Sequence, residues 1–437
     1  MKQWIEAPPQ THDRTITLYC GRDKSLTHRA IMFASLAQGT SRIQKPLLGA
    51  DCLSTISCFE ALGVSIRVDD EIHIESKGAA SFRTPPSPLD CGNSGTTARL
   101  ILGILSAIPG LKTTLIGDQS LSKRPMIRVI QPLKAMGAQI DSTGNNFLPI
   151  TIEGQTLKAI DHAVDKASAQ VKSCLMLAAL FTKGITRIRL PKGSRDHTER
   201  VLEKMGAPMG TRIEGDEESI WINGPFSVKP LDVVIPVDPS SVAFFAVLGL
   251  LRSQGQIKLP EMLDNETRTG FIRVLSRMCD GLLLESAASK DFIEPITTLT
   301  VSGGRKMLGT QIEAHEVPTL VDEIPILAVA AAFAETPSLF RGLSELRVKE
   351  SDRLELTAKL LKDAGAACEI RGDDLWIQGG LKEVTPFESD PEGDHRLAMA
   401  AAILARRCKK PCCILDSECV RVSFPNFFEA LEAVNSF

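Results

Sequence analysis

The hydrophobic and polar positions of the chain repeat one pattern: an apolar helical segment that ends near a glycine, then two short alternating strands around a polar turn. A weaker copy, VLSRMCDGLLLE, begins at residue 274, and FFEALEAVNSF at 427–437 echoes the helix of the first copy. The four clear copies are FEALGVSIRVDDEIHIE (59–75), LKAMGAQIDSTGNNFLPITIEG (133–154), LEKMGAPMGTRIEGDEESIWING (202–224) and LLKDAGAACEIRGDDLWIQGG (360–380). The pattern predicts a repeated α/β unit.

The glycines of these copies, at 63, 137, 206, 281 and 365, are separated by 69 to 84 residues, and six units in 437 residues would average about 73. This period exceeds that of open solenoids, so compact domains are expected. Between the copies lie almost wholly apolar helical segments that open with Ser or Asp caps, such as 168–181 and 321–335. Such helices need burial on several sides. We therefore expect an α/β protein with two pseudo-symmetric domains, each of three units with helices packed inside a ring of sheets.

Composition narrows the class of protein. A length of 437 residues favours two domains, and a net charge of −3 with one Tyr and three Trp argues against a nucleic-acid binder. The N-terminus lacks the apolar core of a signal peptide, and no apolar run reaches the length of a membrane span. Eleven cysteines without a CxxC pair indicate reduced thiols in a cytoplasm, and seven dispersed histidines give no metal site.

Two glycine-rich segments offer anion-binding groups. GRDKSLTHRA (21–30) resembles half of a phosphate-binding loop, but Asp23 replaces the required glycine, leaving Lys24, Ser25 and Arg29 near a predicted helix start. In LDCGNSGTTARL (89–100), Thr occupies the last glycine position of a nucleophile elbow, which makes Ser94 a poor nucleophile. Taken alone, each segment is equally consistent with an ordinary capped helix or turn.

Similar polar groups precede other apolar helices in both halves of the chain. Asp322 and Glu323 open one such helix, and Asp394, His395 and Arg396 open another, where a carboxylate is costly without a partner or a role. GDQSLSKRPM (117–126), ASAQVKS (167–173) and KGSRDHTER (192–200) add Ser, Gln, Lys and Arg side chains. If these helix starts converge, they form a positive pocket for a small substrate that carries phosphate and carboxylate groups.

LRVKESDRL (346–354) combines cations and carboxylates. If it is helical, Lys349 and Arg353 lie four residues apart around Glu350. Most such runs are solvated faces, and we assign Arg347 and Asp352 to outer salt bridges.

Taken together, these segments resemble the family of 5-enolpyruvylshikimate-3-phosphate synthase. The motifs that carry the resemblance follow the family's order from residue 23 to 427: DKSLTHRA, GNSGTTARL, GDQSLSKRPM, SAQVKS, SRDHTER, VDEIPILAVAAAFAE, LRVKESDRL, DHRLAMA and SFPNF. The family's fold has two domains of three βαβαββ units each, an inside-out α/β architecture. The resemblance implies one domain of residues 1–21 plus 239–437, a second of 22–238, and an active site in the cleft between them.

The resemblance also implies transfer of the enolpyruvyl group of phosphoenolpyruvate to the 5-hydroxyl of shikimate 3-phosphate, without cofactor or metal, in a cytoplasmic monomer inhibited by glyphosate. Glu350 is expected to be the acid for the methylene and Asp322 the base for the hydroxyl, with Lys24 sharing proton transfer. The residues expected at phosphoenolpyruvate are Lys24, Gly95, Arg124, Gln170, Arg353 and Arg396. Those expected at shikimate 3-phosphate are Lys24, Ser25, Arg29, Ser168, Ala169 (through its backbone), Gln170, Ser194, Arg195, Asp322 and Lys349.

The sequence departs from the family at two places. Val422 stands where a family lysine precedes the SFP segment, so Arg421 is a candidate substitute, and a tyrosine used by some members is absent near His197. Asn93, Thr96 and His395 are further candidates. Gly95 carries no methyl group, which predicts sensitivity to glyphosate.

Two alternatives remain beside this interpretation. UDP-N-acetylglucosamine enolpyruvyl transferase has the same fold, but it starts with a GKNAA-type segment and uses a loop cysteine, where this chain has DKSLTHRA and SKRPM. An inactive anion-binding relative would lack charged groups, whereas Lys24, Asp322, Glu350 and Arg396 are all present.

Overall fold

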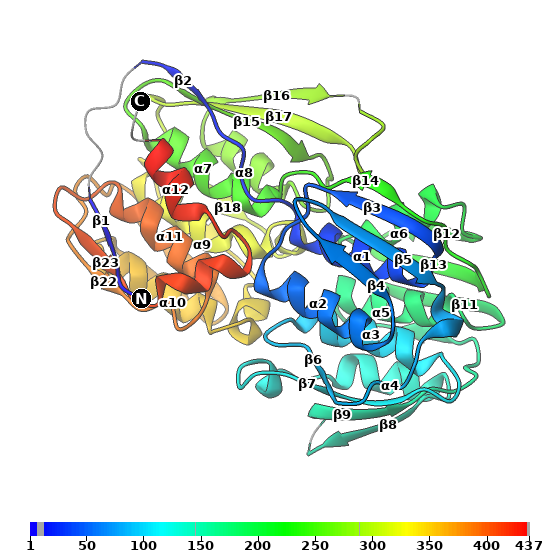
Figure 1. Cartoon of the computed structure of the whole chain (residues 1–437). Coiled ribbons are helices and arrows are strands. Elements are labelled where there is room, and N and C mark those ends of the chain that lie inside the picture. The colour runs from blue at the N-terminus through cyan, green and yellow to red at the C-terminus, as the bar shows by residue number, and fades with distance from the viewer. Residues whose placement is uncertain (7–12, 145, 288, 435–437) are drawn as a thin grey trace. The chain divides into compact units, whose positions relative to one another are not determined.

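The computed structural model describes residues 1–6, 13–144, 146–287 and 289–434, which form two compact units (Figure 1). Unit 1 comprises Met1–Asp23, Pro236–Lys290 and Glu294–Phe437, and unit 2 comprises Lys24–Ile235 and Asp291–Ile293. Each unit is built from three small sheets.

Unit 2 contains three four-stranded sheets, each accompanied by two helices. The first has the strand order β14 (Asp232–Val234), β3 (Gln38–Gln44), β5 (Ile72–Lys77), β4 (Ser65–Val68), with helices α1 (Lys24–Leu36) and α2 (Ala50–Ala61). The second has the order β6 (Leu89–Asp90), β7 (Lys112–Ile116), β9 (Phe147–Glu153), β8 (Gln139–Thr143), with α3 (Gly95–Ser106) and α4 (Ile127–Ala135). The third has the order β10 (Asp161–Ala163), β11 (Gly184–Pro191), β13 (Glu217–Gly224), β12 (Met209–Glu214), with α5 (Ala169–Ala179) and α6 (His197–Lys204).

Unit 1 contains two four-stranded sheets and one three-stranded sheet. The first has the order β2 (Thr15–Thr17), β15 (Gln256–Leu263), β17 (Ile296–Ser302), β16 (Leu282–Ala287), with α7 (Pro239–Leu251) and α8 (Gly270–Met278). The second has the order β18 (Gln311–Ile312), β19 (Ser338–Phe340), β21 (Asp374–Ile377), β20 (Cys368–Arg371), with α9 (Ile324–Phe333) and α10 (Arg353–Asp363). The third has the order β22 (Glu388–Ser389), β23 (Cys412–Ile414), β1 (Gln3–Ile5), with α11 (His395–Ala405) and α12 (Phe427–Ala433).

The strand orders confirm six repeats of the predicted unit. In the described residues five of them have the four strands of a βαβαββ unit, and the last has three. In every sheet the first strand is parallel to the second, and the second is antiparallel to the strand beyond it. The first sheet of unit 2 takes its parallel strand, β14, from the end of that unit's sequence, and β1 completes the last sheet of unit 1. The helix at 427–433 occupies the place of a sixth repeat helix, as its sequence echo predicted.

The first helix of each repeat is buried, as its apolar sequence predicted. Every residue of α7 and α11 is buried, and within unit 1 Figure 1 shows α7, α9 and α11 side by side. Within unit 2, α3 packs against both α1 and α5. None of the helices in the described ranges is both long and apolar enough to cross a membrane.

The start and the end of these helices follow from local chemistry. Side chains of Ser94, Ser168, Asp238, Asp352 and Asp394 accept a backbone N–H at the starts of α3, α5, α7, α10 and α11, which satisfies donors that have no partner inside the helix. The predicted cap is thereby confirmed for the segment 168–181 but not for 321–335, because Glu323 at the start of α9 accepts no such hydrogen bond and Asp322 pairs with Arg353 instead.

The repeat glycines end the second helices. Gly63, Gly137, Gly206 and Gly365 have φ between 78° and 100°, a left-handed conformation that glycine adopts without strain. At Gly63, for example, the Gly63 N–H donates to Glu60 O and the Val64 N–H donates to Phe59 O. The weaker copy differs, because α8 ends at Met278 with Cys279 in an extended conformation before Gly281.

The bounds of the units differ by two or three residues from the predicted 1–21 plus 239–437 and 22–238. Asp23 stays with unit 1, where its N–H donates to Pro236 O at 2.9 Å. Residues 291–293 join unit 2 because Ile293 N–H donates to Val234 O and Val234 N–H donates to Asp291 O. Long-range backbone hydrogen bonds, which have no local sequence signal, set these bounds.

Candidate functional site

In unit 2 the candidate side chains come from helix starts. Lys24 is the first residue of α1, and its Nζ lies 2.9 Å from Oδ2 of Asp51, a buried carboxylate in the first turn of α2. Ser25 follows it and is partly exposed. Lys24 is therefore held in place by a side chain that the sequence did not single out.

Arg29, one turn later, is buried and braces three helices. Its Nε donates to Thr198 Oγ1 at 2.8 Å and its Nη2 donates to Ser173 Oγ at 2.7 Å. These hydroxyl groups orient the guanidinium without neutralising its charge. Arg29 thus ties α1 to α5 and α6.

The loop before α3 gathers several candidates. Ser94 is buried as the N-cap of α3, accepting from Thr97 N at 3.1 Å, which agrees with its rejection as a nucleophile. Arg124 Nη2 donates to Asn93 Oδ1 at 2.7 Å. The α4 helix begins at Ile127, so Arg124 lies in the loop before it.

Gly95 makes room for two guanidinium groups. Arg99 Nη1 donates to Gln170 Oε1 at 2.9 Å, and Gln170 Nε2 donates to Thr96 Oγ1 at 3.2 Å. A β-carbon at Gly95 would lie 2.5 Å from Arg99 Nη1 and 3.6 Å from Arg124 Nη1. The absence of a side chain at Gly95 is therefore required for the observed position of Arg99.

The start of α5 and the loop before α6 complete this unit's set. Ser168 caps α5, Ala169 is its first residue, and Arg195 is partly exposed. Ser194 is buried, and its Oγ donates to Glu218 Oε2 at 3.4 Å.

Lys172, near the start of α5, has a different role from the other polar groups of its segment. It is fully buried and pairs with Glu199 and, at 3.4 Å, with Glu218. Burial raises the pKa of Glu199, and the charge of Lys172 opposes that rise. Lys172 therefore neutralises the carboxylates behind Ser194.

A buried hydrogen-bonded chain joins the starts of the first three helices of unit 2. His28 Nδ1 lies 2.7 Å from Thr55 Oγ1, which lies 2.6 Å from Thr97 Oγ1, and the Thr97 hydroxyl donates to Ser94 Oγ at 2.7 Å. Burial lowers the pKa of His28 from its ordinary 6.5 to about 3. The folded chain therefore holds this imidazole neutral.

We expect unit 2 to lose stability in acid through His28. The unfolded chain binds this proton below pH 6.5 and the folded chain only near pH 3, so stability is present above 6.5 and is lost as the pH falls toward 3. The slope from this one group reaches at most about 1.4 kcal/mol per pH unit. Urea unfolding of His28→Asn between pH 4.5 and 7.5 is expected to show a correspondingly flatter profile.

The matched control for this prediction is the exposed His315. His315→Asn should leave the pH profile unchanged. A His28→Asn profile as steep as that of the unaltered chain would contradict the buried neutral state.

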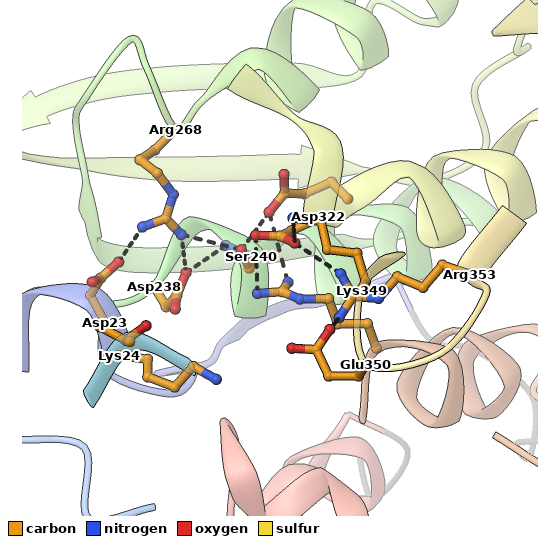
Figure 2. Close-up of polar contacts among 12 residues, drawn as sticks. Asp23, Lys24, Asp238, Ser240, Arg268, Asp322, Lys349, Glu350 and Arg353 are labelled. Carbon is orange, nitrogen blue, oxygen red and sulfur yellow. Dashed lines mark hydrogen bonds and ion pairs between the residues drawn. The ribbon is translucent and has the colours of Figure 1, made fainter. Parts of the chain in front are cut away.

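In unit 1 the candidates surround Arg353, the first residue of α10 (Figure 2). Its guanidinium is fully buried and binds three carboxylates: Nη1 lies 2.9 Å from Asp322, Nη2 lies 2.5 Å from Glu350, and Nε lies 2.6 Å from Asp394. Burial opposes the charge of Arg353, but the three carboxylates together raise its pKa. One cation thus holds the expected acid and the expected base.

Asp322 connects this cluster to two further cations. Lys349 Nζ lies 3.6 Å from Asp322 Oδ1, and Arg396 Nη2 lies 3.7 Å from Asp322 Oδ2. Arg396 also lies 3.9 Å from Glu323, so the two carboxylates that open α9 both have cationic partners. The pocket expected from sequence was strongly positive, whereas the cations of this cluster are matched by carboxylates.

The LRVKESDRL segment is not one helix. A 3-10 turn (Ser344–Val348) ends before Lys349, and α10 begins at Arg353. Arg347 pairs with Asp352, Glu355 and Asp373 at 3.0–3.2 Å, which confirms its outer salt-bridge role. The bend after Val348 separates Arg347 from the cluster, because a continuous helix would have placed both arginines around Glu350.

The two remaining candidates of unit 1 are His395 and Arg421. His395 is buried as the first residue of α11. Arg421 has a side chain that is 70% exposed and pairs with Glu418 at 3.0 Å. This exposed pairing with Glu418 does not support the prediction that Arg421 takes the place of the family lysine.

Comparison with known families identifies the family of the chain. Residues 14–431 match the family model of EPSP synthase (3-phosphoshikimate 1-carboxyvinyltransferase). The chain belongs to the EPSP synthase family.

Relatives and solved structures agree with this assignment. The chain is 41% identical over 416 residues to the 3-phosphoshikimate 1-carboxyvinyltransferase of Bacillus pumilus, covering 94% of this chain and 95% of the relative. It is 42% identical over 412 residues to that of Caldicellulosiruptor saccharolyticus, covering 94% of each. The EPSP synthase of Acinetobacter baumannii has a TM-score of 0.86 at 36% identity, covering 99% of this chain and 98% of that one.

A further solved structure shows that the same fold occurs at low sequence identity. The enolpyruvyl transferase NikO of Streptomyces tendae has a TM-score of 0.74 at 16% identity, covering 99% of this chain and 96% of NikO. At that identity the likeness supports the fold alone. The EPSP synthase family assignment therefore rests on the family model and on the relatives near 40% identity.

Sequence reasoning about this member of the EPSP synthase family missed some polar partners. Asp51 is an ordinary first-turn acid of α2, and Arg99 lies inside α3 without a local signal that marks it. Arg268 stands in a polar turn, DNETRTG, which is typical of a surface loop. Only their contacts distinguish these side chains from surface charges.

Proposed function

We propose that the chain transfers the enolpyruvyl group of phosphoenolpyruvate to the 5-hydroxyl of shikimate 3-phosphate and releases phosphate. The observation that carries this proposal is Arg353, which holds Asp322 and Glu350 on two arms of one buried guanidinium in a member of the EPSP synthase family. Addition to the substrate double bond needs an acid and a base held at fixed positions.

The two units supply different groups for this reaction. Unit 2 offers Lys24, Arg124 and Gln170 beside Gly95 for phosphoenolpyruvate, and its hydroxyl groups suit shikimate 3-phosphate. Unit 1 offers Arg353 and Arg396 for the carboxylate of phosphoenolpyruvate, with Asp322 as base and Glu350 as acid.

Binding of phosphoenolpyruvate is proposed to release Glu350 for catalysis. Of the three carboxylates on Arg353, Glu350 is the most exposed, at 24% of its side chain against 11% for Asp322 and none for Asp394. An incoming substrate carboxylate can therefore replace Glu350 on Nη2 with the smallest rearrangement. The freed carboxylate, once it has taken up a proton from solvent, can then turn to the methylene carbon and donate that proton.

The test of the function is phosphate release. The purified chain is mixed with phosphoenolpyruvate and either shikimate 3-phosphate or UDP-N-acetylglucosamine, and phosphate is followed over time. Release in the mixture with shikimate 3-phosphate, and none in the mixture with UDP-N-acetylglucosamine, supports the proposal. Release only with UDP-N-acetylglucosamine, or with neither, would overturn it.

Gly95→Ala is expected to weaken the binding of both phosphoenolpyruvate and glyphosate. The added methyl group would meet Arg99 at 2.5 Å and disturb its hydrogen bond to Gln170. We expect the KM for phosphoenolpyruvate to rise by about tenfold or more, the order for loss of a hydrogen bond to a charged group. The glyphosate inhibition constant is expected to rise with it, as measured in steady-state assays.

The KM for shikimate 3-phosphate serves as an internal comparison and should change less, because its expected site shares Gln170 but also has Ser25, Arg29 and Ser194. The unaltered chain should be inhibited at glyphosate concentrations that stop sensitive members of the family. An unaltered chain that keeps its rate at those concentrations would contradict the predicted sensitivity.

We also propose a cytoplasmic monomer. The eleven cysteines are free and nine of them are buried, which suits a reducing compartment. Cell fractionation and light scattering of the purified chain would test the location and the oligomeric state.

A further inference from the structure

Arg268 lies in unit 1 at the centre of a second buried ion-pair cluster (Figure 2). Its side chain is 1% exposed. Nη1 donates to Asp23 Oδ2 at 2.7 Å, and Nη2 donates to Asp238 Oδ1 at 2.6 Å and to Ser240 Oγ at 3.2 Å. Burial opposes the charge of Arg268, but Asp23, Asp238 and Glu323 raise its pKa. Removing this cation would take a charged partner from the buried carboxylates of Asp23 and Asp238.

The two aspartates on Arg268 lie on two of the segments at which the chain passes between the units. Asp23 is the last residue of unit 1 before Lys24, and Pro236 is the first residue after the chain returns. The segments also bond to each other, since Asp23 N–H donates to Pro236 O at 2.9 Å and Asp238 N–H donates to Gly21 O at 2.8 Å. Arg268 therefore fastens the residue bonded directly to Lys24.

From Arg268, polar contacts lead to the candidate base. The Ser240 hydroxyl donates to Glu323 Oε1, the same oxygen that lies 3.9 Å from Arg396 Nη1. Arg396 in turn lies 3.7 Å from Asp322. These residues form a chain of alternating charge inside unit 1 that links the crossing segments to Asp322.

The turn that carries Arg268 is itself rigid. Asn265 Oδ1 accepts from Thr267 N at 2.9 Å, and Asn265 Nδ2 donates to Glu294 Oε2 at 2.8 Å. The backbone N–H of Arg268 donates to Asn265 O at 2.8 Å. Such bracing fixes the direction of a long side chain, which a surface arginine does not need.

We propose that Arg268 is a positioning residue for the enolpyruvyl transfer: it holds the crossing segment that ends at Lys24 and, through Ser240 and Glu323, it orients Arg396 and Asp322. This inference rests on the proposed function. Arg268 does not touch the substrates in this proposal. Its effect is on the placement of groups that do.

The experiment compares Arg268→Lys, Arg268→Met and Ser240→Ala with the unaltered chain in the phosphate-release assay. Lysine keeps the charge but cannot donate to Asp23, Asp238 and Ser240 in one planar arrangement. We expect kcat to fall about 100-fold in both Arg268 variants, the order seen when reacting groups are misplaced by an ångström. For Ser240→Ala we expect about a tenfold fall, the order for losing a hydrogen bond to a charged group.

The pH profile supplies a readout that a structural role would not move. Arg268→Met removes a positive charge from the series of polar groups that leads to Asp322, and this disfavours the ionised form of Asp322. The acid limb of the kcat profile should therefore shift to higher pH in this variant. Arg252→Met is the matched control, because Arg252 is also a buried arginine of unit 1 and bonds to the backbone oxygens of Val434 and Gln254. It should lower the melting temperature while keeping kcat and the pH profile of the folded enzyme.

The outcomes separate the two proposals. An unaltered chain that releases no phosphate overturns the proposed function and this inference together. An active unaltered chain whose Arg268→Lys and Ser240→Ala variants keep kcat and the acid limb overturns this inference alone. If Arg268→Met does not fold, the other two variants still decide.

Discussion

Glu350→Gln is expected to lower kcat by about 10²–10⁴-fold, the range that a positioned general acid contributes. The amide oxygen of Gln can still accept from Arg353 Nη2, which lies 2.5 Å from Glu350, so the local packing should persist. The amide cannot carry the proton to the methylene carbon. We therefore expect the KM values of both substrates to change far less than kcat, as measured in steady-state phosphate release.

Glu355→Gln is the matched control, because Glu355 lies on the next turn, is largely exposed and pairs with the outer Arg347 at 3.1 Å. It should keep full activity. A Glu350→Gln variant with unchanged kcat and a raised KM would assign Glu350 to substrate binding. Loss of kcat in Lys24→Met with an active Glu350→Gln would make Lys24 the acid.

Arg353→Met is expected to destabilise unit 1 by about 3–5 kcal/mol, the usual cost of removing one partner from a buried ion pair. Its guanidinium binds Asp322, Glu350 and Asp394, and the last of these is fully buried. Without Arg353 these carboxylates repel one another in a site with little water. Activity should be lost with it, since the same cation is proposed to bind phosphoenolpyruvate.

Urea unfolding of Arg353→Met beside Arg347→Met measures this difference. Arg347 belongs to the same segment but bonds to partners at the surface, where ion pairs contribute little to stability. Arg353→Lys should be intermediate in stability, because a single ammonium cannot reach three carboxylates. Equal unfolding free energies for the Arg353→Met and Arg347→Met variants would refute a buried clamp at Arg353.

Much of the fold could be predicted because its signals are local. A helix that ends at a left-handed glycine, as at Gly63 and Gly365, and then meets two alternating strands recurs at a regular spacing. Apolar runs such as 324–333 can only be buried helices. The bounds of the units were less accurate, because the pairing of 291–293 with β14 joins residues far apart in sequence.

The placement of the charged side chains, in contrast, could be predicted only in part. Lys24, Asp322, Glu350 and Arg353 were identified through ordered motifs, yet their sequence neighbours Arg347 and Asp352 look the same in composition. A bend after Val348 and burial at the start of α10 turned Arg353 inward, while Arg347 remained at the surface. Sequence spacing alone would have placed both around Glu350.

The sequence by itself therefore determined the repeat, the buried helices, their caps and the set of motifs that indicate the family, because periodicity and capping act over a few residues. The tertiary structure decided which charges are partners. Arg268 with Asp23 and Asp238, and Lys24 with Asp51, are joined across 245, 30 and 27 residues. Such pairs depend on where the folded chain brings distant segments together and excludes water, and no local pattern encodes that.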